Sequence, residues 1–338
     1  MLVTLKEINI ISYEILNAIH VPADHIKIIN DTIEFAHKRG KGTHGIGRVP
    51  IYVNRIQNGL MSADTPISVI NDHNAILHID AHNGFGQVAA YYAMNEAILR
   101  AEKYGISCVE VKDSNNFGTA GFFAKIAAEN NMIGIVMGNS GPAIAVGKSG
   151  KAILGTNPVS IAMPSGEKNN PFLFDMATSM AARGKIRLAE KNGESIPEGW
   201  ALNVHGTPTT NPSEALKGSM VPIGGYKGIG ISMVIDLVAG MLSGSAFGGN
   251  VLPLNNNIGY SRYGNCIIVI DISSFIDIDT YKKNMIYFYQ VVHDNQGIIP
   301  GELSYLKERD NINEVNISDK IIYEINHLTE KLNINYKL

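Results

Sequence analysis

A histidine and an arginine four residues apart are the residues best suited to chemistry in this 338-residue chain. His44 and Arg48 lie in segment 41–52, which reads Lys-Gly-Thr-His-Gly-Ile-Gly-Arg-Val-Pro-Ile-Tyr. An imidazole, with an ordinary pKa of about 6.5, can protonate the alkoxide that forms when a carbonyl accepts a hydride. A planar guanidinium binds a carboxylate through two hydrogen bonds and so orients the neighbouring carbonyl. The pair suggests reduction of a 2-oxo acid.

The local conformation of this segment decides whether the two side chains meet. A helix would place His44, Arg48 and Tyr52 on one face. The three glycines of the segment argue against a regular helix before Arg48, and they also let the backbone approach a ligand closely. The alternative is a glycine-rich loop in which His44 caps a helix or bonds a backbone carbonyl.

Composition limits the partners of the chain. It is 45% hydrophobic and 17% charged, so it can bury a large core, and its length allows two or three domains. The net charge of -3 and the lack of a basic run give no electrostatic reason to expect nucleic acid or an anionic membrane surface as partner. A small-molecule partner is expected instead.

Cysteine usage and the N-terminal sequence indicate a cytoplasmic protein. Cys108 and Cys266 belong to no Cys-x-x-Cys or Cys/His cluster, so neither a disulfide scaffold nor structural zinc is expected. His73, His78 and His82 also lack metal-site spacing, and no metal is predicted. The N-terminus has no basic segment followed by an apolar core, and the apolar helix candidate 229–242 is short, so no membrane association is expected.

The order of elements predicts an α/β fold with a helical N-terminal unit. Helices are predicted at 5–19, at 23–38 and from Pro50 to Gly59, followed by a hairpin with strands 66–70 and 75–79 around turn 71–74. Helices and strands then alternate. The further helices are 87–104, 119–129, one from Ser179, 228–242 and 319–332, and the further strands are 107–111, 133–137, 159–163, 172–176 and 266–270. We expect a unit of residues 1–72 that packs with C-terminal helices in 303–338, and an α/β domain of residues 73–302 that binds cofactor and substrate.

A nicotinamide cofactor would need an unusual binding loop here, because no Gly-x-Gly-x-x-Gly follows a first strand. Segment 222–228 precedes a helix, where free amides and Lys227 could neutralise a pyrophosphate. Segment 174–179 runs from a strand end into a helix that Thr178 or Ser179 could cap. Ordinary helix capping is the alternative for both. Asp175 could hold His44 in one tautomer or raise its pKa, or it could be a surface aspartate at a strand end.

Two loop segments near residue 140 complete the candidates. Segment 138–142 follows a predicted strand, where small polar residues can meet a substrate, although a plain turn fits as well. Segment 141–149 resembles a phosphate-binding P-loop but has five residues between its glycines where that motif has four, so nucleoside triphosphate binding is rejected.

Five ordered blocks resemble the type-2 malate/L-lactate dehydrogenase family, over residues 5 to 305. This family also includes ureidoglycolate dehydrogenase, sulfolactate dehydrogenase, diketogulonate reductase and the cyclic-imine (piperideine-carboxylate) reductases. The blocks are Thr43-His44-Gly45 with Arg48, Gly155-Thr156-Asn157-Pro158, Asp175-Met-Ala-Thr178-Ser179, Gly224-Gly225-Tyr226-Lys227-Gly228 and Pro300-Gly301-Glu302.

The resemblance implies NAD(P)-dependent interconversion of 2-hydroxy and 2-oxo acids by a homodimer with a non-Rossmann, mixed-sheet α/β fold. It implies that His44 is the acid/base residue, that Asp175 orients it and that Arg48 anchors the carboxylate. The implied substrate contacts, besides Arg48, are Thr43, Asn116, Ser140, Thr156 and Asn157. The implied cofactor contacts are Asp175, Met176, Ala177, Thr178, Ser179, Tyr226, Lys227, Gly228, Pro300, Gly301 and Glu302, with either NAD(H) or NADP(H) as cofactor.

The chain departs from the family at two places. Many members have histidine in a Ser-x-His-x-Gly block, where this chain has Asn116, which cannot accept a proton, so that proton transfer would rest on His44. Gly147-Lys148 stands where a Gly-Gly pair is usual. Two other functions remain open from sequence: reduction of a cyclic imino acid, which needs the same groups, and binding of NAD(H) or a carboxylate without catalysis.

Overall fold

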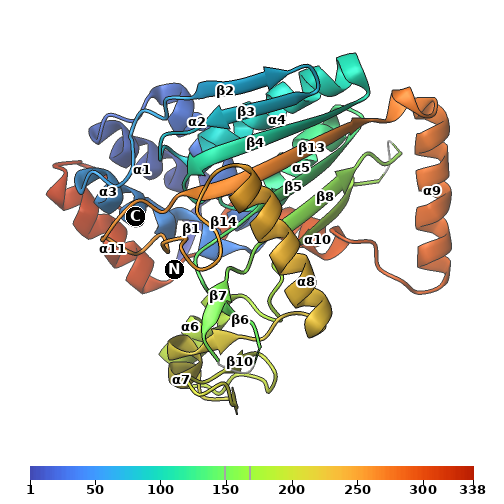
Figure 1. Ribbon diagram of the computed structural model, residues 1–338. Coiled ribbons are helices and arrows are strands. Elements are labelled where there is room, and N and C mark those ends of the chain that lie inside the picture. The colour runs from blue at the N-terminus through green and yellow to red at the C-terminus, as the bar shows by residue number, and fades with distance from the viewer. Residues whose placement is uncertain (148–149, 167–168) are drawn as a thin grey trace.

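A seven-stranded sheet forms the centre of the computed structural model, which describes residues 1–147, 150–166 and 169–338 (Figure 1). The strands lie in the order β2-β3-β4-β13-β5-β8-β9, and β3 and β4 are parallel whereas the other neighbours are antiparallel. Such a sheet confirms the predicted mixed-sheet α/β class. Its strands are β2 (Ser68–His73), β3 (Ile76–Asp80), β4 (Ile106–Ser114), β5 (Met132–Gly138), β8 (Val159–Met163), β9 (Phe172–Met176) and β13 (Tyr263–Asp271).

The two faces of this sheet are covered differently. One face packs on α4 (Gly86–Tyr104) and α5 (Ala120–Glu129), whose many buried alanines bring the helix backbones close to the strands. The other face carries α8 (Tyr226–Ile235) and the π-helix η3 (Asp236–Leu242), which cover part of it. Because strand side chains alternate between faces, β4 sends Val109 and Val111 to the α4 side and Cys108 and Glu110 to the α8 side.

The N-terminal helices share one hydrophobic core with the C-terminal helix. The core is formed by α1 (Leu5–Ala18), α2 (Ala23–Lys38), α3 (Val49–Gln57) and α11 (Asp319–Lys331). Thr4 and Glu7 form a capping box that starts α1. Strands β1 (Leu2–Thr4) and β14 (Glu314–Asn316) pair the two ends of the chain. All four predicted helices of this unit are therefore confirmed, to within a few residues at their ends.

A small second sheet, in the order β11-β10-β12-β6-β7, forms a unit with its own core that the sequence did not predict. Its strands are two or three residues long and so carry no measurable periodicity. They are β6 (Ile144–Ala145), β7 (Ala152–Leu154), β10 (Ala201–Leu202), β11 (Pro208–Thr209) and β12 (Ser219–Met220), packed with α6 (Arg183–Asn192) and α7 (Pro212–Lys217).

Three predicted elements differ from the structure. The helix predicted from Ser179 begins at Arg183, because residues 178–180 instead pair with 221–223. The hairpin turn is shorter than predicted, since β2 runs through to His73 and Asn74 makes the turn with a φ of +53°. The predicted helix 228–242 is α8 continued by η3.

Two further helices follow β13 in the chain. They are α9 (Ile278–Asp294) and α10 (Glu302–Asp310), and the sequence predicted neither as a separate element. Across the described ranges, no helix has the length and apolar character needed to cross a membrane.

Candidate active site

Segment 41–48 folds as two 3-10 turns, η1 (Gly42–His44) and η2 (Ile46–Arg48), and leads directly into α3. The prediction that glycines prevent a regular helix before Arg48 is confirmed. The junction is fixed by His37, whose Nε2 accepts a hydrogen bond of 2.9 Å from the Ile46 amide. A Cβ at Gly45 would lie 2.1 Å from that same Nε2, so only glycine lets the turn approach His37.

Because His37 is buried and accepts this hydrogen bond, we expect the free energy of unfolding to decrease in acid. Burial lowers the pKa of His37 to about 4, below its ordinary value of about 6.5. Between these pH values the unfolded chain binds more protons than the folded one, so stability decreases as pH falls, by about 3 kcal/mol at pH 4. Urea unfolding at several pH values will measure this loss. In the variant His37→Asn, the slope of the free energy of unfolding against pH should be smaller by up to about 1.4 kcal/mol per pH unit. The control His73→Asn, at an exposed position of the hairpin, should keep the wild-type slope. An unchanged slope in His37→Asn would contradict this role.

His44 and Arg48 lie close enough to interact electrostatically. Burial, followed by the positive charges of Arg48 and Lys41, lowers the pKa of His44 to about 3, so its imidazole is neutral near pH 7. The Nδ1 atom of His44 is buried and has no hydrogen-bond partner among the described residues. Arg48 is held by its Nε, which donates to the Thr43 carbonyl at 2.8 Å. A buried nitrogen without a partner beside a partly exposed guanidinium is the arrangement that a small anionic ligand would complete.

Asp175, at the end of β9, forms a salt bridge with Lys41. The predicted contact of Asp175 with His44 is not formed among the described residues, because the Lys41 ammonium occupies the Asp175 carboxylate. Gly121 in the first turn of α5 makes room for it, since a Cβ there would lie 2.7 Å from Asp175 Oδ2. Sequence reasoning missed Lys41, although its position three residues before His44 was a signal. Asp175 therefore ties the His44 segment to the large sheet through Lys41.

The predicted substrate residues Ser140, Thr156 and Asn157 come together in one hydrogen-bonded cluster. Asn157 Oδ1 accepts from the Ser140 amide at 3.1 Å, and its Nδ2 donates to the Ser232 carbonyl at 2.9 Å. Ser140 Oγ accepts from the Thr156 amide at 3.1 Å. Asn157 is fully buried, so its amide holds the loops, whereas Ser140 and Thr156 are partly exposed.

Backbone hydrogen bonds bring the three predicted cofactor segments next to β9 and its C-terminal extension. The Leu173 amide donates to the Pro300 carbonyl at 3.0 Å, which places 300–302 against β9. Beyond the end of β9, the Ile223 amide donates to the Thr178 carbonyl at 2.9 Å, and Ser179 pairs with Pro222. Met176 and Ala177 lie between these contacts, and Tyr226, Lys227 and Gly228 follow at the start of α8. Segments more than 120 residues apart in the chain are thus neighbours.

The start of α8 has the features that bind a pyrophosphate. Gly224 and Gly225 have φ values of +57° and +61°, and no atom lies within 4 Å of where a Cβ at Gly225 would be. In the described chain no side chain caps this helix, and Lys227 and Tyr226 are exposed. Uncapped amides beside a lysine fit the phosphates of a dinucleotide. Glu302, in contrast, is engaged with His293 at 2.7 Å and with the Ile299 amide at 2.9 Å, so its carboxylate stabilises its own turn.

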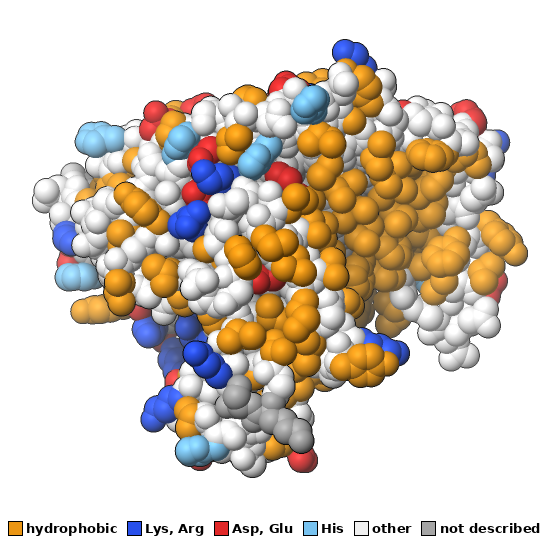
Figure 2. All heavy atoms as spheres, in the orientation of Figure 1, with side chains coloured by type: hydrophobic (Ala, Val, Ile, Leu, Met, Phe, Trp, Pro, Cys, Tyr) orange, Lys and Arg blue, Asp and Glu red, His pale blue; other side chains and the backbone are white. Residues whose placement is uncertain are grey.

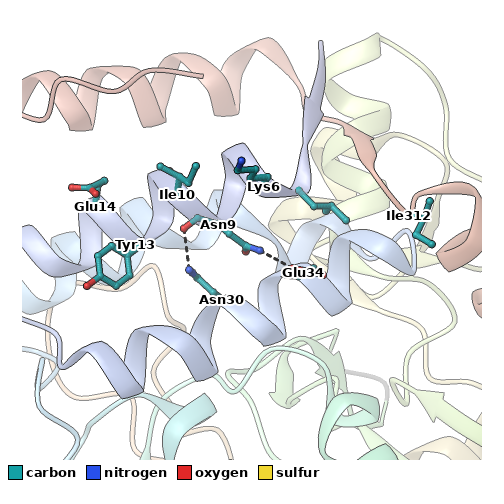
Figure 3. A pocket seen from close by; sticks show the side chains of 9 residues that line it. Lys6, Asn9, Ile10, Tyr13, Glu14, Asn30, Glu34 and Ile312 are labelled. Atoms are coloured by element: carbon teal, nitrogen blue, oxygen red, sulfur yellow. Dashed lines mark hydrogen bonds between the residues drawn. The ribbon is translucent and has the colours of Figure 1, made fainter.

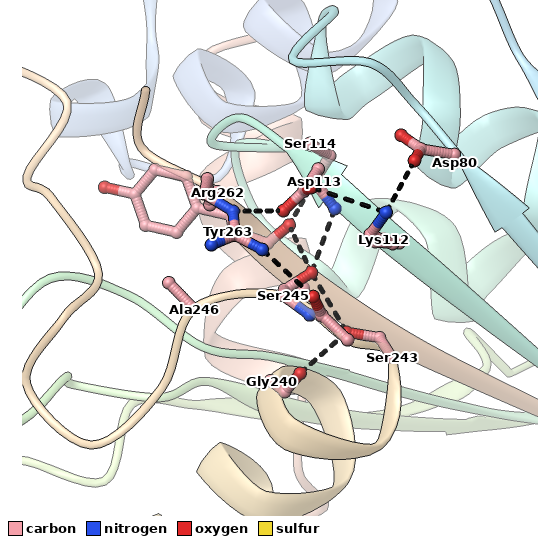
Figure 4. A network of polar contacts seen from close by, with 12 residues as sticks. Asp80, Lys112, Asp113, Ser114, Gly240, Ser243, Ser245, Ala246, Arg262 and Tyr263 are labelled. Atoms are coloured by element: carbon pink, nitrogen blue, oxygen red, sulfur yellow. Dashed lines mark hydrogen bonds and ion pairs between the residues drawn. The ribbon is translucent and has the colours of Figure 1, made fainter. Parts of the chain in front are cut away.

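Tyr263 is a neighbour of Arg48 that the sequence did not reveal. It begins β13 and is held by the polar network of Figure 4, in which Ser114 Oγ donates to its carbonyl at 3.1 Å. Arg262 Nε donates to Asp113 in the same network, at 2.8 Å. Burial raises the pKa of the Tyr263 hydroxyl, while the charge of Arg48 acts in the opposite direction. The phenol is therefore protonated near pH 7.

A separate groove of about 500 Å³ lies between α1 and α2 (Figure 3). Within it, the Asn9 side chain donates to Glu34 at 2.6 Å and Asn30 donates to the Asn9 backbone carbonyl at 3.0 Å. None of the predicted site residues lines it. The groove is therefore not part of the site around His44.

The chain is similar to known proteins over nearly its whole length. The family model for malate/L-lactate dehydrogenase matches residues 3–326. L-sulfolactate dehydrogenase of Methanothermobacter thermautotrophicus is 38% identical over 336 residues, which cover 98% of this chain and 97% of that protein. Malate/(S)-sulfolactate dehydrogenase of Methanothermus fervidus is 36% identical, with 99% of both chains covered. The solved sulfolactate dehydrogenase from Methanocaldococcus jannaschii has a TM-score of 0.92 at 30% identity and covers 99% of this chain and 98% of its own.

The chain belongs to the malate/L-lactate dehydrogenase family. The membership inferred from five sequence blocks is confirmed, and the chain is an oxidoreductase of the 2-hydroxy acid dehydrogenase class.

Within this dehydrogenase, Thr43 packs against α6, and Asn116 lies in the loop after β4. A Cβ at Gly184 of α6 would lie 2.3 Å from Thr43 Cγ2, so the small unit closes tightly on the His44 segment. Asn116 is partly exposed, and its Oδ1 accepts from the Gly118 amide at 3.2 Å. Lys148, the other departure from the family pattern, lies outside the described residues, as does Ser149 of the rejected P-loop.

Proposed function

We propose that this dehydrogenase interconverts a small 2-oxo acid and its 2-hydroxy acid, with His44 exchanging the proton and Arg48 binding the carboxylate. The observation that carries the proposal is the neutral His44, whose buried Nδ1 lacks a partner among the described residues while Arg48 lies beside it. The planar guanidinium of Arg48 can donate two parallel hydrogen bonds to a carboxylate. Thr43, Asn116, Ser140 and Thr156 supply further polar contacts, and Asn157 positions Ser140.

The charge of the substrate changes the pKa of His44. In the free protein, burial and two cations keep its imidazole neutral, the state that accepts the hydroxyl proton during oxidation. When a carboxylate binds Arg48, it cancels one of these charges, and the pKa of His44 rises toward its ordinary range. In the opposite direction the protonated imidazole returns that proton to the oxygen of the new hydroxyl. Asp175 acts on this step indirectly, since its carboxylate offsets the charge of Lys41.

The cofactor is proposed to lie along segments 174–179, 224–228 and 300–302. Bound nicotinamide supplies or accepts the hydride. Lys227 and the amides at the start of α8 bind its phosphates, and the exposed Tyr226 covers them. One relative is a (2R)-3-sulfolactate dehydrogenase that uses NADP(+) and another is a ureidoglycolate dehydrogenase that uses NAD(+), so both cofactors are to be tested.

The test is the change in NADH and NADPH absorbance on mixing the protein with a panel of 2-oxo acids. The panel starts with oxaloacetate and sulfopyruvate, because relatives 36–38% identical are named for malate and sulfolactate. It continues with pyruvate, oxalurate, diketogulonate and cyclic imino acids. Cofactor oxidation with a 2-oxo acid supports the proposal. Oxidation with only a cyclic imino acid, or cofactor binding without any turnover, would contradict it.

We also propose that the protein is a homodimer that pairs through α8 and η3. Besides Tyr226, six large apolar side chains are exposed there: Ile231, Met233, Val234, Leu237, Met241 and Leu242. Figure 2 shows hydrophobic atoms gathered over the strands between α8 and α9. An exposed apolar surface of this kind is typical of an interface.

A charge at this surface is expected to separate the subunits. Leu237→Glu would bury an unpaired carboxylate in the interface, so the variant should elute as a monomer where the wild type is a dimer. Light scattering during size-exclusion chromatography measures the mass. The matched control is Leu99→Glu, which changes an exposed leucine of α4 and should leave a dimer. A wild-type monomer, or a Leu237→Glu dimer of unchanged stability, would contradict this interface.

A further inference from the structure

Two cysteines that are distant in sequence meet on the α8 side of the large sheet. The Sγ atoms of Cys108 and Cys266 are 3.8 Å apart, although 158 residues separate them in the chain. They belong to the antiparallel strands β4 and β13, in which Cys266 pairs with Glu110. The two sulfurs and a Glu110 carboxylate oxygen all lie within 4.8 Å of one another.

The spacing of the sulfurs, which is that of a thiol–thiol hydrogen bond, also fits a metal site. In tetrahedral zinc sites the Zn–S distance is about 2.3 Å, which places two thiolate sulfurs ~3.8 Å apart. The observed 3.8 Å therefore requires no movement of either sulfur. A disulfide would require the sulfurs to approach to about 2.05 Å. Two thiolates with one carboxylate are also a ligand set that favours a thiophilic divalent cation over Mg²⁺ or Ca²⁺.

Glu110 gives an independent indication of a ligand. Its side chain is in the middle of β4 with only 6% of the residue exposed, and its carboxylate oxygens have no hydrogen-bond partner among the described residues apart from a contact with the Cys266 thiol. The surroundings are apolar, with Ile235 and Ala239 packed on Cys266. A buried carboxyl group without an amide, hydroxyl or cationic partner is costly, and a cation between the strands would satisfy it.

The cluster is not fully enclosed. Cys108 is partly exposed, so water can reach its side of the cluster. His78 of β3 pairs with Glu110 in the parallel register, and its Nε2 is bonded to the Ser243 carbonyl at 2.9 Å. This contact ties the loop after η3 to the strand beside the cluster.

We propose that Cys108, Cys266 and Glu110 bind one zinc ion or a chemically similar thiophilic cation, with water as the fourth ligand. The ion would link β4 to β13, two neighbouring central strands of the large sheet, and so stabilise the fold. The cluster contains none of the residues assigned to substrate or cofactor, and the proposal does not depend on the proposed function. Sequence spacing gave no sign of it, because the ligands come from two strands that only the sheet brings together.

The test uses Co²⁺ as a spectroscopic probe of the full-length, reduced and metal-free protein. A thiol titration first confirms that both cysteines are free. We expect one equivalent of Co²⁺ to produce a sulfur-to-cobalt charge-transfer band and the visible bands of four-coordinate cobalt, and Zn²⁺ to abolish both. Cys108→Ser and Cys266→Ser should lose the band, and Glu110→Gln should keep it with affinity lowered by about 10–100-fold. The control His73→Asn should bind as the wild type does.

Thermal unfolding separates loss of the site from loss of the fold. Cys266 is fully buried and its variant can be destabilised, so the decisive comparison uses the partly exposed Cys108. In the presence of a chelator, wild type and Cys108→Ser should have similar Tm values. Added Zn²⁺ should raise the Tm of the wild type only. The absence of a charge-transfer band in the reduced wild type, or its persistence in Cys108→Ser, would overturn the proposal.

Discussion

Replacing His44 with alanine is expected to lower kcat by about 10²–10⁴-fold, the usual contribution of a general acid or base. The reason is specific to this site. Asn116 cannot exchange a proton, the carboxylate of Asp175 is engaged with Lys41, and the hydroxyl of Tyr263 is held protonated by burial. His44 is the remaining group that can accept a proton beside Arg48. Steady-state oxidation of the 2-hydroxy acid, followed by cofactor absorbance, measures the loss.

Two controls show whether the effect of His44→Ala is chemical. His73→Asn, at an exposed histidine of the hairpin, should leave kcat unchanged. The Kd of NADH for His44→Ala, measured by fluorescence, should remain near the wild-type value, because the cofactor segments do not include residue 44. A variant with wild-type turnover would remove His44 from the mechanism. In that case Asn116→His becomes the informative variant, because many family members have histidine there.

Replacing Arg48 with alanine is expected to weaken substrate binding by about 10–100-fold, as the loss of charge-assisted hydrogen bonds to a carboxylate does. The effect should appear mainly in KM for the 2-oxo acid. Arg48→Lys keeps the charge but loses the planar guanidinium, so its KM should lie between the values of the wild type and of Arg48→Ala. Lys27→Ala on α2 is the control, because that cation is exposed and belongs to none of the proposed site segments.

Arg48→Ala should also change the pH dependence of kcat/KM. After burial, the charge of Arg48 is the next cause that lowers the pKa of His44 from its ordinary value to about 3. Without Arg48 the pKa of His44 should therefore rise, and the acid limb of kcat/KM should move to higher pH. Arg48→Lys should leave that limb near its wild-type position. An Arg48→Ala variant with unchanged KM and an unchanged profile would show that the carboxylate binds elsewhere.

Local sequence was sufficient for the long elements and for the central pair of the site. Helices α1, α2 and α4 were predicted because apolar residues recur at helical spacing over fourteen or more residues. His44 and Arg48 were found because their chemistry and their four-residue separation lie within one segment. The glycines around them predicted the interruption that η1 and η2 show.

Contacts between distant segments were decided by the tertiary structure. The strands of the small sheet have two or three residues each and form only because they pair with one another. The helix predicted from Ser179 starts four residues later because residues 178–180 pair with 221–223.

The same distinction between local sequence and contacts of distant segments applies to the sites. The sequence by itself determined the family, the mixed α/β class and the His44–Arg48 pair, since each depends on residue types in a fixed local order. Only the tertiary structure decided that Lys41 neutralises Asp175 and that Cys108 meets Cys266 and Glu110. Side-chain pairing across strands depends on register and on which face each residue occupies, and neither is encoded by spacing along the chain.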